Sequence, residues 1–352
     1  MRRLIVGTGV AALALGMGVG TAHAATPAWR VTQTTKLPGD DILSDVTVAP
    51  TGSTWAVGKR TVSGTTRPVV QRLSGTTWKD VRLPAGWSMA LNVVDASSSK
   101  NVWAFSAEES AVVHWNGKKW TSAKFSGVFR ATDADVVSAS NVWAVNGGTT
   151  ARHWNGKRWA SVRLPAHVVA LQAVSAKNIW AAGSIGDKAA VVHYDGRSWK
   201  VVKTVALAKP EPDAATVLTG IAVSGKNVWA VGAQSWSCGE DGDDTCYTRL
   251  ALRLTGTKSK SFVTAKGQAY TKVAADGSGG VWILQGAWDP ALVHVTGDTF
   301  TSSAAPRPSG HDVNLTALAN RPGTKTVWSV GGSSPEGDPD DPTSDGVYLR
   351  TG

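Results

Sequence analysis

The 352-residue sequence lacks three features that would place it in other structural classes. No stretch after the first 24 residues has sustained helical periodicity, which argues against a helical domain. No stretch there is apolar over the roughly 20 residues that a membrane-spanning helix needs. Cysteine occurs only at Cys238 and Cys246, so the chain can form at most one internal disulfide.

One apolar run is present, over residues 4–19 at the N-terminus. It follows two arginines and precedes Ala22-His23-Ala24, which is the order of a secretory signal peptide over residues 1–24. We therefore expect a secreted, extracellular protein that is not inserted in a membrane. In an oxidising compartment the two cysteines, which enclose a short polar loop, favour a disulfide over a metal site.

Tryptophan, in contrast, is abundant, and seven of the 17 tryptophans recur in one short context such as NVWAVG. Successive copies lie 37 to 53 residues apart. A four-stranded blade of a β-propeller needs roughly 40 to 50 residues, so the spacing predicts an all-β, seven-bladed propeller. The seven residues are Trp55, Trp103, Trp143, Trp180, Trp229, Trp282 and Trp328.

Each repeat is expected to form four antiparallel strands, which we call a to d from the propeller axis outward. Alternating apolar and polar residues, with Asn-Gly or Asp-Gly turns, are typical of β-hairpins. The repeats predict blades at about residues 43–84, 90–127, 131–165, 170–207, 217–265, 269–305 and 313–352.

The seventh repeat has no d-strand of its own, because the sequence ends at GVYLRTG. Residues 25–38, which contain TPAWRV and end in KLP, match the first d-strand, TTWKDVRLP. We expect these residues to complete blade 7 as its outer strand, which closes the ring and removes an unpaired edge. Residues 25–352 then form a single domain.

Residues that repeat in every blade are expected to pack the fold. This interpretation covers the seven tryptophans and four histidines that share one c-strand register. The histidines are His114, His153, His193 and His294.

The two faces of the propeller are expected to differ in charge, although the formal net charge is +10. The loops that join b to c and d to a vary in length, and those at residues 237–246 and 333–346 are acidic. The charge alone therefore does not predict a nucleic-acid partner. The short a-to-b and c-to-d turns carry Lys100, Lys118, Lys119, Lys157, Arg158, Lys177, Arg197, Lys226 and Lys325.

Three tryptophans fall outside the repeat register and map to the variable loops, together with other aromatic and imidazole side chains. An exposed ring can stack on a sugar while polar neighbours bond to its hydroxyls. The alternative is that these rings pack loop against loop. The candidate ligand-binding residues are Trp87, Trp236, Trp288, His167, His311 and Tyr270, with Phe129 on the same face.

The sequence is compatible with two further chemistries. Asp241, Asp243 and Asp244 lie in an acidic loop that offers oxygen ligands to Ca²⁺, without the spacing of an EF-hand. We expect no cofactor, and the sequence leaves calcium open. Near the axis, Asp45 and Asp133 are the carboxylates that a glycosidase or lyase would use.

The repeated VWAVG and HWNGxxW motifs resemble secreted actinobacterial β-propellers of a tryptophan-repeat, kelch-like or lectin-like type, over residues 25–352. Related propellers include lectins and recognition subunits of larger secreted assemblies, among them antibacterial toxin particles. The resemblance implies binding, and it transfers no individual site residue. The Asp-box SxDxGxTW of sialidases is not matched, and the copper ligands of galactose oxidase cannot be assembled.

These observations predict a secreted, non-catalytic binding protein that recognises a cell-surface or cell-envelope glycan through its variable loops. The alternatives are a protein-interaction scaffold and a carbohydrate-active enzyme.

Overall fold

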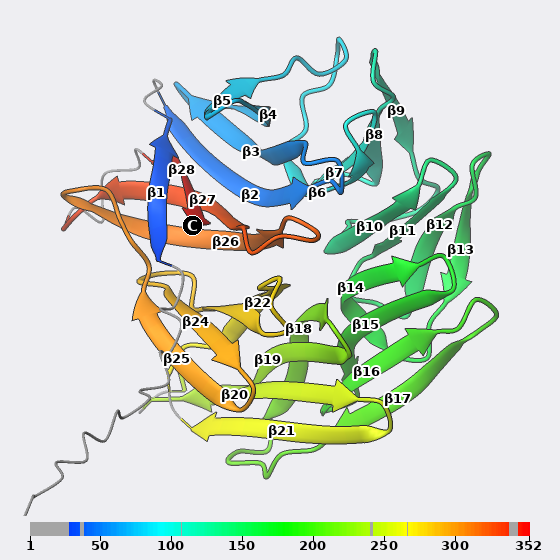
Figure 1. The fold of residues 1–352 in the computed structure, drawn as a ribbon, viewed down its shortest axis with the longest axis vertical. Helices are drawn as coiled ribbons and strands as arrows, with labels where there is room; N and C mark the ends of the chain where they lie inside the picture. Colours follow the sequence, from blue (N-terminus) through cyan, green and yellow to red (C-terminus); the bar gives the residue numbers. More distant parts are fainter. Residues whose placement is uncertain (1–27, 36–38, 107, 240–241, 266, 338–343) are drawn as a thin grey trace, which may run out of the picture.

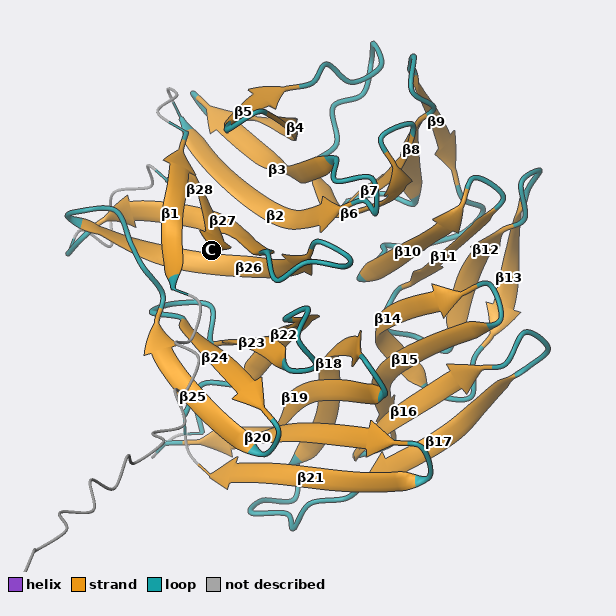
Figure 2. Ribbon diagram, in the orientation of Figure 1, coloured by secondary structure: helices purple, strands orange, loops and turns teal. Residues whose placement is uncertain are grey.

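The protein is a seven-bladed β-propeller in which every blade is a four-stranded antiparallel sheet (Figures 1 and 2). The structure is a computed structural model that describes residues 28–35, 39–106, 108–239, 242–265, 267–337 and 344–352. The predicted signal peptide lies outside these residues. None of the described residues belongs to a helix long and apolar enough to cross a membrane.

The strands follow the repeat pattern. Blade 1 contains β2 (Asp40–Val48), β3 (Thr54–Val62), β4 (Thr65–Ser74) and β5 (Thr77–Asp80); blade 2 contains β6 (Leu91–Ser98), β7 (Asn101–Ser106), β8 (Ala111–Trp115) and β9 (Trp120–Lys124). Blade 3 contains β10 (Asp133–Ser138), β11 (Asn141–Val145), β12 (Thr150–Trp154) and β13 (Trp159–Arg163); blade 4 contains β14 (His167–Ser175), β15 (Asn178–Ile185), β16 (Lys188–Tyr194) and β17 (Trp199–Val205).

The remaining three blades follow the same order. Blade 5 contains β18 (Ala215–Ser224), β19 (Asn227–Cys238), β20 (Asp244–Thr255) and β21 (Lys258–Ala265); blade 6 contains β22 (Tyr270–Ala275), β23 (Val281–Gln285), β24 (Ala291–Thr296) and β25 (Thr299–Ala304). Blade 7 contains β26 (His311–Asn320), β27 (Val327–Pro335), β28 (Asp345–Thr351) and the N-terminal β1 (Trp29–Thr34).

The N-terminal strand closes the ring, as the sequence predicted. β1 pairs antiparallel with β28, from Trp29 opposite Thr351 to Thr34 opposite Val347 (Figure 1, blue beside red). The Trp29 ring meets Trp282 of blade 6 edge-on, with 5.3 Å between centroids. On the other side, the side-chain oxygen of Gln33 accepts the main-chain N–H of Trp78 in blade 1 at 2.9 Å. One strand thus joins three blades.

The repeated tryptophans form the core, and six of the seven are buried. Each stands directly across from a histidine or an arginine of the neighbouring c-strand. The Trp103 and His114 rings stack with 4.1 Å between centroids, and His114 Nε2 shares a hydrogen bond of 2.8 Å with Asn101 Oδ1. The four in-register histidines and Arg72, Arg253 and Arg350 all occupy this packing position.

A β-bulge recurs in the half of the innermost strand nearer the variable face in six blades. In three of them the extra residue is Asn92, Thr219 or Thr316. Its side chain donates a hydrogen bond to a main-chain carbonyl of the next blade, at 2.5, 3.0 and 2.8 Å respectively. The bulge turns a polar side chain sideways and links adjacent sheets.

The two cysteines form the predicted disulfide, with 2.08 Å between their sulfur atoms. The bond lies near the tip of the hairpin formed by β19 and β20. Each of these strands is 12 residues long, whereas the equivalent strands of blade 3 have five. The blade 5 hairpin therefore extends well beyond the equivalent strands of blade 3 on the variable face.

Removing the closing strand tests this architecture. In a chain that lacks residues 1–24, further deletion of residues 25–38 is expected to lower the melting temperature by at least about 10 °C or to cause aggregation. The deletion removes the Trp29 packing and exposes the edge of β28. Arg30→Ala, at an exposed position of the same strand, is the control and is expected to melt like the parent. A truncated chain that melts at the parent temperature would refute the closure.

Candidate functional site

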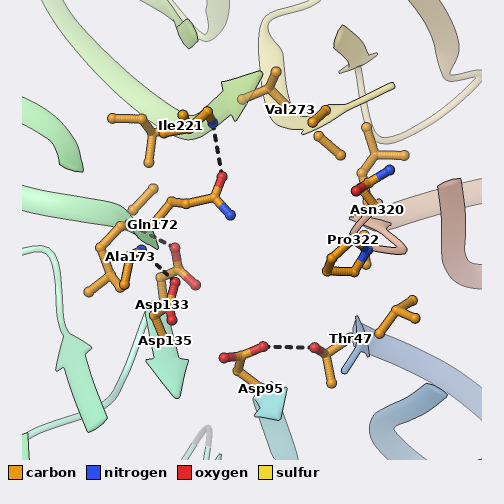
Figure 3. A pocket seen from close by; sticks show the side chains of 18 of the residues that line it. Thr47, Asp95, Asp133, Asp135, Gln172, Ala173, Ile221, Val273, Asn320 and Pro322 are labelled. Carbon is orange, nitrogen blue, oxygen red and sulfur yellow. Dashed lines mark hydrogen bonds between the residues drawn. The ribbon is translucent and has the colours of Figure 1, made fainter. Parts of the chain in front are cut away.

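A channel with a volume of about 850 Å³ runs along the propeller axis and is lined by residues of all seven blades except those of the outer strands (Figure 3). Its lining begins within the innermost strands, at residues such as Asp45 and Asp133, and continues into a-to-b turn residues such as Pro50 and Pro322. The mouth of the channel therefore lies on the face of the short turns. The loops of variable length lie on the opposite face.

Carboxylates of three consecutive blades line this channel, and Figure 3 shows three of them, Asp95, Asp133 and Asp135. Each accepts a main-chain N–H from the innermost strand of the next blade. Asp45 accepts from Val94 at 2.8 Å and Asp133 from Leu171 at 2.8 Å. The same bond joins Asp95 to Val136 at 2.6 Å, Asp135 to Ala173 at 2.7 Å and, through an amide oxygen, Gln172 to Val223 at 3.0 Å.

Burial changes the acidity of these groups. Desolvation raises the pKa of Asp45 from 3.8 to about 7 and the pKa of Asp133 to about 6, while the positive charge of Lys272 opposes the shift. Desolvation also raises the pKa of Asp95 and Asp135. Carboxyl groups that titrate near neutral pH in a cavity are a property of many general acids. At Asp45 and Asp133, however, both side-chain oxygens accept main-chain N–H groups.

On the variable face, Trp288 is the most exposed of the three candidate tryptophans, with 66% of its surface accessible. It lies in the b-to-c loop of blade 6 and forms a main-chain bridge to Asn314 of blade 7. The next residue, Asp289, has a φ of 46°, in the left-handed region that few residues other than glycine adopt. Strained positions of this kind cluster at binding loops.

Charged and polar side chains lie on the segments that adjoin Trp288. The Arg307 guanidinium lies 2.6 Å from the Asp312 carboxylate and 3.8 Å from the Asp289 carboxylate. His311, at the start of β26, shares a hydrogen bond of 3.0 Å with the main-chain oxygen of Ser309. The structure thus places Trp288 and His311 on adjoining segments of blades 6 and 7.

The other candidates are dispersed. Trp87, in the loop after blade 1, is partly buried and donates its indole N–H to the main-chain oxygen of Met89 at 2.8 Å. Trp236 stands opposite Cys246 in the long hairpin of blade 5. His167 is exposed at the start of β14, where its Nδ1 lies 3.3 Å from the main-chain oxygen of Gly147.

Two aromatic residues differ from the expectation of exposed rings. Tyr270 is 5% exposed and packs in the core between blades 5 and 6, with the Arg249 guanidinium 5.6 Å from its ring centroid. Phe129 is 2% exposed and packs against Phe125. Both residues adjoin the propeller core, and burial of their large apolar rings outweighs exposure on a loop.

The calcium hypothesis rests on a loop that is described only in part, because Asp241 lies outside the described residues. Asp243 and Asp244 are described and exposed. Across the described ranges, no group of three or more His, Cys, Asp or Glu side chains is arranged to hold a metal ion.

Sequence reasoning missed Arg307 and Asp312 as neighbours of Trp288. The residues are separated by about 20 positions and belong to different blades, so only the bridge between the loops brings them together. In the sequence, the polar stretch RPSGHD at residues 307–312 is the one feature that could have indicated a polar surface beside Trp288.

Comparison with known proteins identifies the fold only. No protein-family model and no curated protein sequence matches the chain. Among solved structures, a streptogramin B lyase matches with a TM-score of 0.63 at 12% identity, over 92% of this chain and 98% of its own. YCF48 bound to D1 peptide matches with a TM-score of 0.61 at 13% identity, over 94% of this chain and 98% of YCF48. The WD40 propeller domain of Doa1 matches with a TM-score of 0.58 at 13% identity, over 91% of this chain and 96% of the Doa1 domain.

The raised pKa of Asp45 gives a testable pH dependence. Its linked stabilisation is complete below pH 3.8 and is lost as the pH rises through about 7. Asp45→Asn lacks this dependence, so its deficit in free energy of unfolding relative to wild type should shrink by about 2 to 3 kcal/mol between pH 5 and pH 8. Urea unfolding of both proteins measures the deficit. The same deficit at both pH values would contradict the assignment.

The histidines do not confound this comparison. Burial lowers the pKa of His114, His153 and His193, so protonation destabilises the folded protein at low pH. Both proteins carry these residues, and their contribution cancels in the difference.

Proposed function

We propose that the protein is a secreted, non-catalytic binding module of lectin type that recognises a glycan of the cell surface or cell envelope. The ligand site is the surface around Trp288 on the variable face. The exposed Trp288 ring, held on a strained loop beside charged side chains, is the observation that supports this proposal most directly.

The chemistry of the surface suits a sugar. An indole ring offers a flat apolar face to the C–H groups of a pyranose. The carboxylates of Asp289 and Asp312 can accept hydrogen bonds from sugar hydroxyls, and the Arg307 guanidinium can donate them. Because Arg307 is already positioned by Asp312, it would lose little side-chain entropy on binding.

A non-catalytic role is supported by the channel. Asp45 and Asp133, the residues on which an enzyme hypothesis rests, use their oxygens to bind the main chain of their own and the next blade. A carboxyl group in such a position contributes to the ring and is poorly placed to move a proton to a substrate.

A protein or peptide partner is the second candidate. The long, disulfide-linked hairpin of blade 5 extends the variable face and carries Trp236. A propeller of the same fold, YCF48, binds a peptide. This alternative predicts that a protein co-purifies with the chain and that no glycan binds.

Substitution of Trp288 tests the proposed site. Trp288→Ala is expected to weaken binding to the best glycan on an array at least about tenfold, since loss of one stacking ring costs on the order of 1.4 kcal/mol. Isothermal titration with that glycan measures the change. The melting temperature should stay within about 2 °C of wild type, because the ring is largely exposed.

A matched control removes a different exposed apolar side chain. Val128 is 85% exposed on the loop between blades 2 and 3 of the same face, and Val128→Ala should bind like wild type. Unchanged binding by Trp288→Ala, or equal losses in both variants, would refute the site. A wild-type protein that binds no glycan but captures a peptide would favour the second candidate.

A further inference from the structure

The face opposite the variable loops carries an unusual density of positive charge in blades 2, 3 and 4, which are consecutive around the ring (Figure 1). We call the a-to-b and c-to-d turns of these blades the basic turn surface. They span residues 97–101, 116–119, 138–141, 155–158, 175–178 and 195–198, with one acidic residue, Asp195. The seven basic residues are Lys100, Lys118, Lys119, Lys157, Arg158, Lys177 and Arg197, and all are exposed.

The c-to-d turns hold their cationic residues in one repeated geometry. Asn116 Oδ1 accepts the main-chain N–H groups of Lys118 and Lys119, both at 3.0 Å. Asn155 does the same for Lys157 and Arg158 at 3.0 Å. In blade 4, Asp195 Oδ1 accepts from Arg197 and Ser198 at 2.9 Å. These turns satisfy their own main-chain donors and leave the cationic side chains free for solvent or a ligand.

The a-to-b turns add a second cation beside two of these turns. A Cβ on Gly117 would lie 2.7 Å from the side chain of Lys100, and a Cβ on Gly196 would lie 2.7 Å from Lys177. The glycine of each c-to-d turn, with φ near 90°, therefore allows a lysine stem to lie across it. Blade 3 has Ser140 at the equivalent place. Each lysine stem is fixed by packing while its ammonium group reaches water.

These cations are not neutralised within the described part of the protein. None of the seven forms an ion pair there, and the Asp195 carboxylate is bound by Lys200 at 2.8 Å in addition to its main-chain donors. The equivalent turns of blade 6 differ, because Asp298 binds Arg253 and Lys260 at 2.8 and 2.6 Å. Blades 5 and 7 each carry two cations in these turns, Lys226 with Lys258 and Arg321 with Lys325, whereas the turns of blades 1 and 6 carry none. The seven cations of blades 2, 3 and 4 are the part of this charge that lies on three consecutive blades.

We infer that the basic turn surface is a docking site for a linear polymer that carries a phosphate on each repeating unit and has no nucleobases. Cations that recur at equivalent positions from blade to blade match a ligand whose negative charges also recur along a chain. Arginine binds phosphate through two donors and lysine as a point charge. This surface is distinct from the Trp288 site, which lies on the opposite face.

The aromatic residues of the same turns favour a polymer without bases over a nucleic acid. Nonspecific binding of single strands uses free aromatic faces on which bases stack. Trp115 and Trp154 donate their indole N–H groups to main-chain oxygens of Ser99 and Ala139 at 3.2 and 3.1 Å. Their rings contact Trp120 and Trp159, with centroids 5.7 Å apart in both pairs. These rings are already used in packing.

The test compares two variants that lose the same amount of charge. The first replaces five cations of the turn surface by glutamine: Lys118, Lys119, Lys157, Arg158 and Arg197. The second, a control, replaces Lys59, Arg67, Arg82, Arg163 and Lys188, which are exposed and lie toward the variable face. Lys100 and Lys177 stay in both, because their stems pack on glycines. Thermal melts should agree for all three proteins.

The probe is a fluorescein-labelled oligomer of glycerol phosphate, and anisotropy gives its affinity between 50 and 200 mM NaCl. Wild type and control are expected to bind with a steep salt dependence. The turn variant should lose more than about a hundredfold in affinity at 50 mM NaCl and about three units of the logarithmic salt slope. Equal losses in the two variants, or no binding by wild type, would overturn the proposal. So would tighter binding of wild type to a DNA duplex than to the oligomer.

Discussion

The inner edge of each blade presents main-chain N–H groups to the axial channel, and the ring depends on how these groups are satisfied. A strand at a sheet edge has no neighbour on one side, and a buried N–H without a partner costs free energy comparable to a lost hydrogen bond. Here the donors of Val94, Val136 and Leu171 are bound by carboxylates of the preceding blade. The same bonds that satisfy the edges fix the sheets to one another. The carboxylates that line the channel are therefore explained largely by the hydrogen bonds that close the ring.

This constraint separates the structural part of the molecule from the part that is free to vary. Tryptophans, their cross-strand histidines or arginines and the axial carboxylates all hold blades together. Loops that join b to c and d to a contribute fewer of these repeated contacts, and they differ between blades in length and charge. Trp288 is exposed on such a loop, which also bridges to blade 7. On the opposite face, the a-to-b turns of blades 2 to 5 have two residues each between the strands, and the charge of the turns varies from blade to blade.

The fold could be predicted because its signals are local and repeated. The tryptophan spacing indicated seven blades, and the match between the N-terminal segment and a d-strand indicated the closure that β1 and β28 form. Contacts between blades were harder to predict. Asp45 appears in the sequence as one of several polar residues at the axis, and only the register of two neighbouring strands reveals that it binds Val94. Tyr270 and Phe129 follow loops in the sequence, yet both are buried where their blades meet. The Arg307 and Asp312 neighbourhood of Trp288 likewise depends on how two loops meet.

The central claim is that ligands bind on the variable face while the axial carboxylates hold the ring. Hydrogen exchange measured by mass spectrometry, with and without the tightest-binding glycan from an array, tests it most directly. The account predicts slower exchange on ligand addition in residues 286–290 and 307–314, with no change in the channel-lining segments 94–97 and 133–137. Protection confined to those channel segments would contradict it, because the ligand would then occupy the site that we assign to structure.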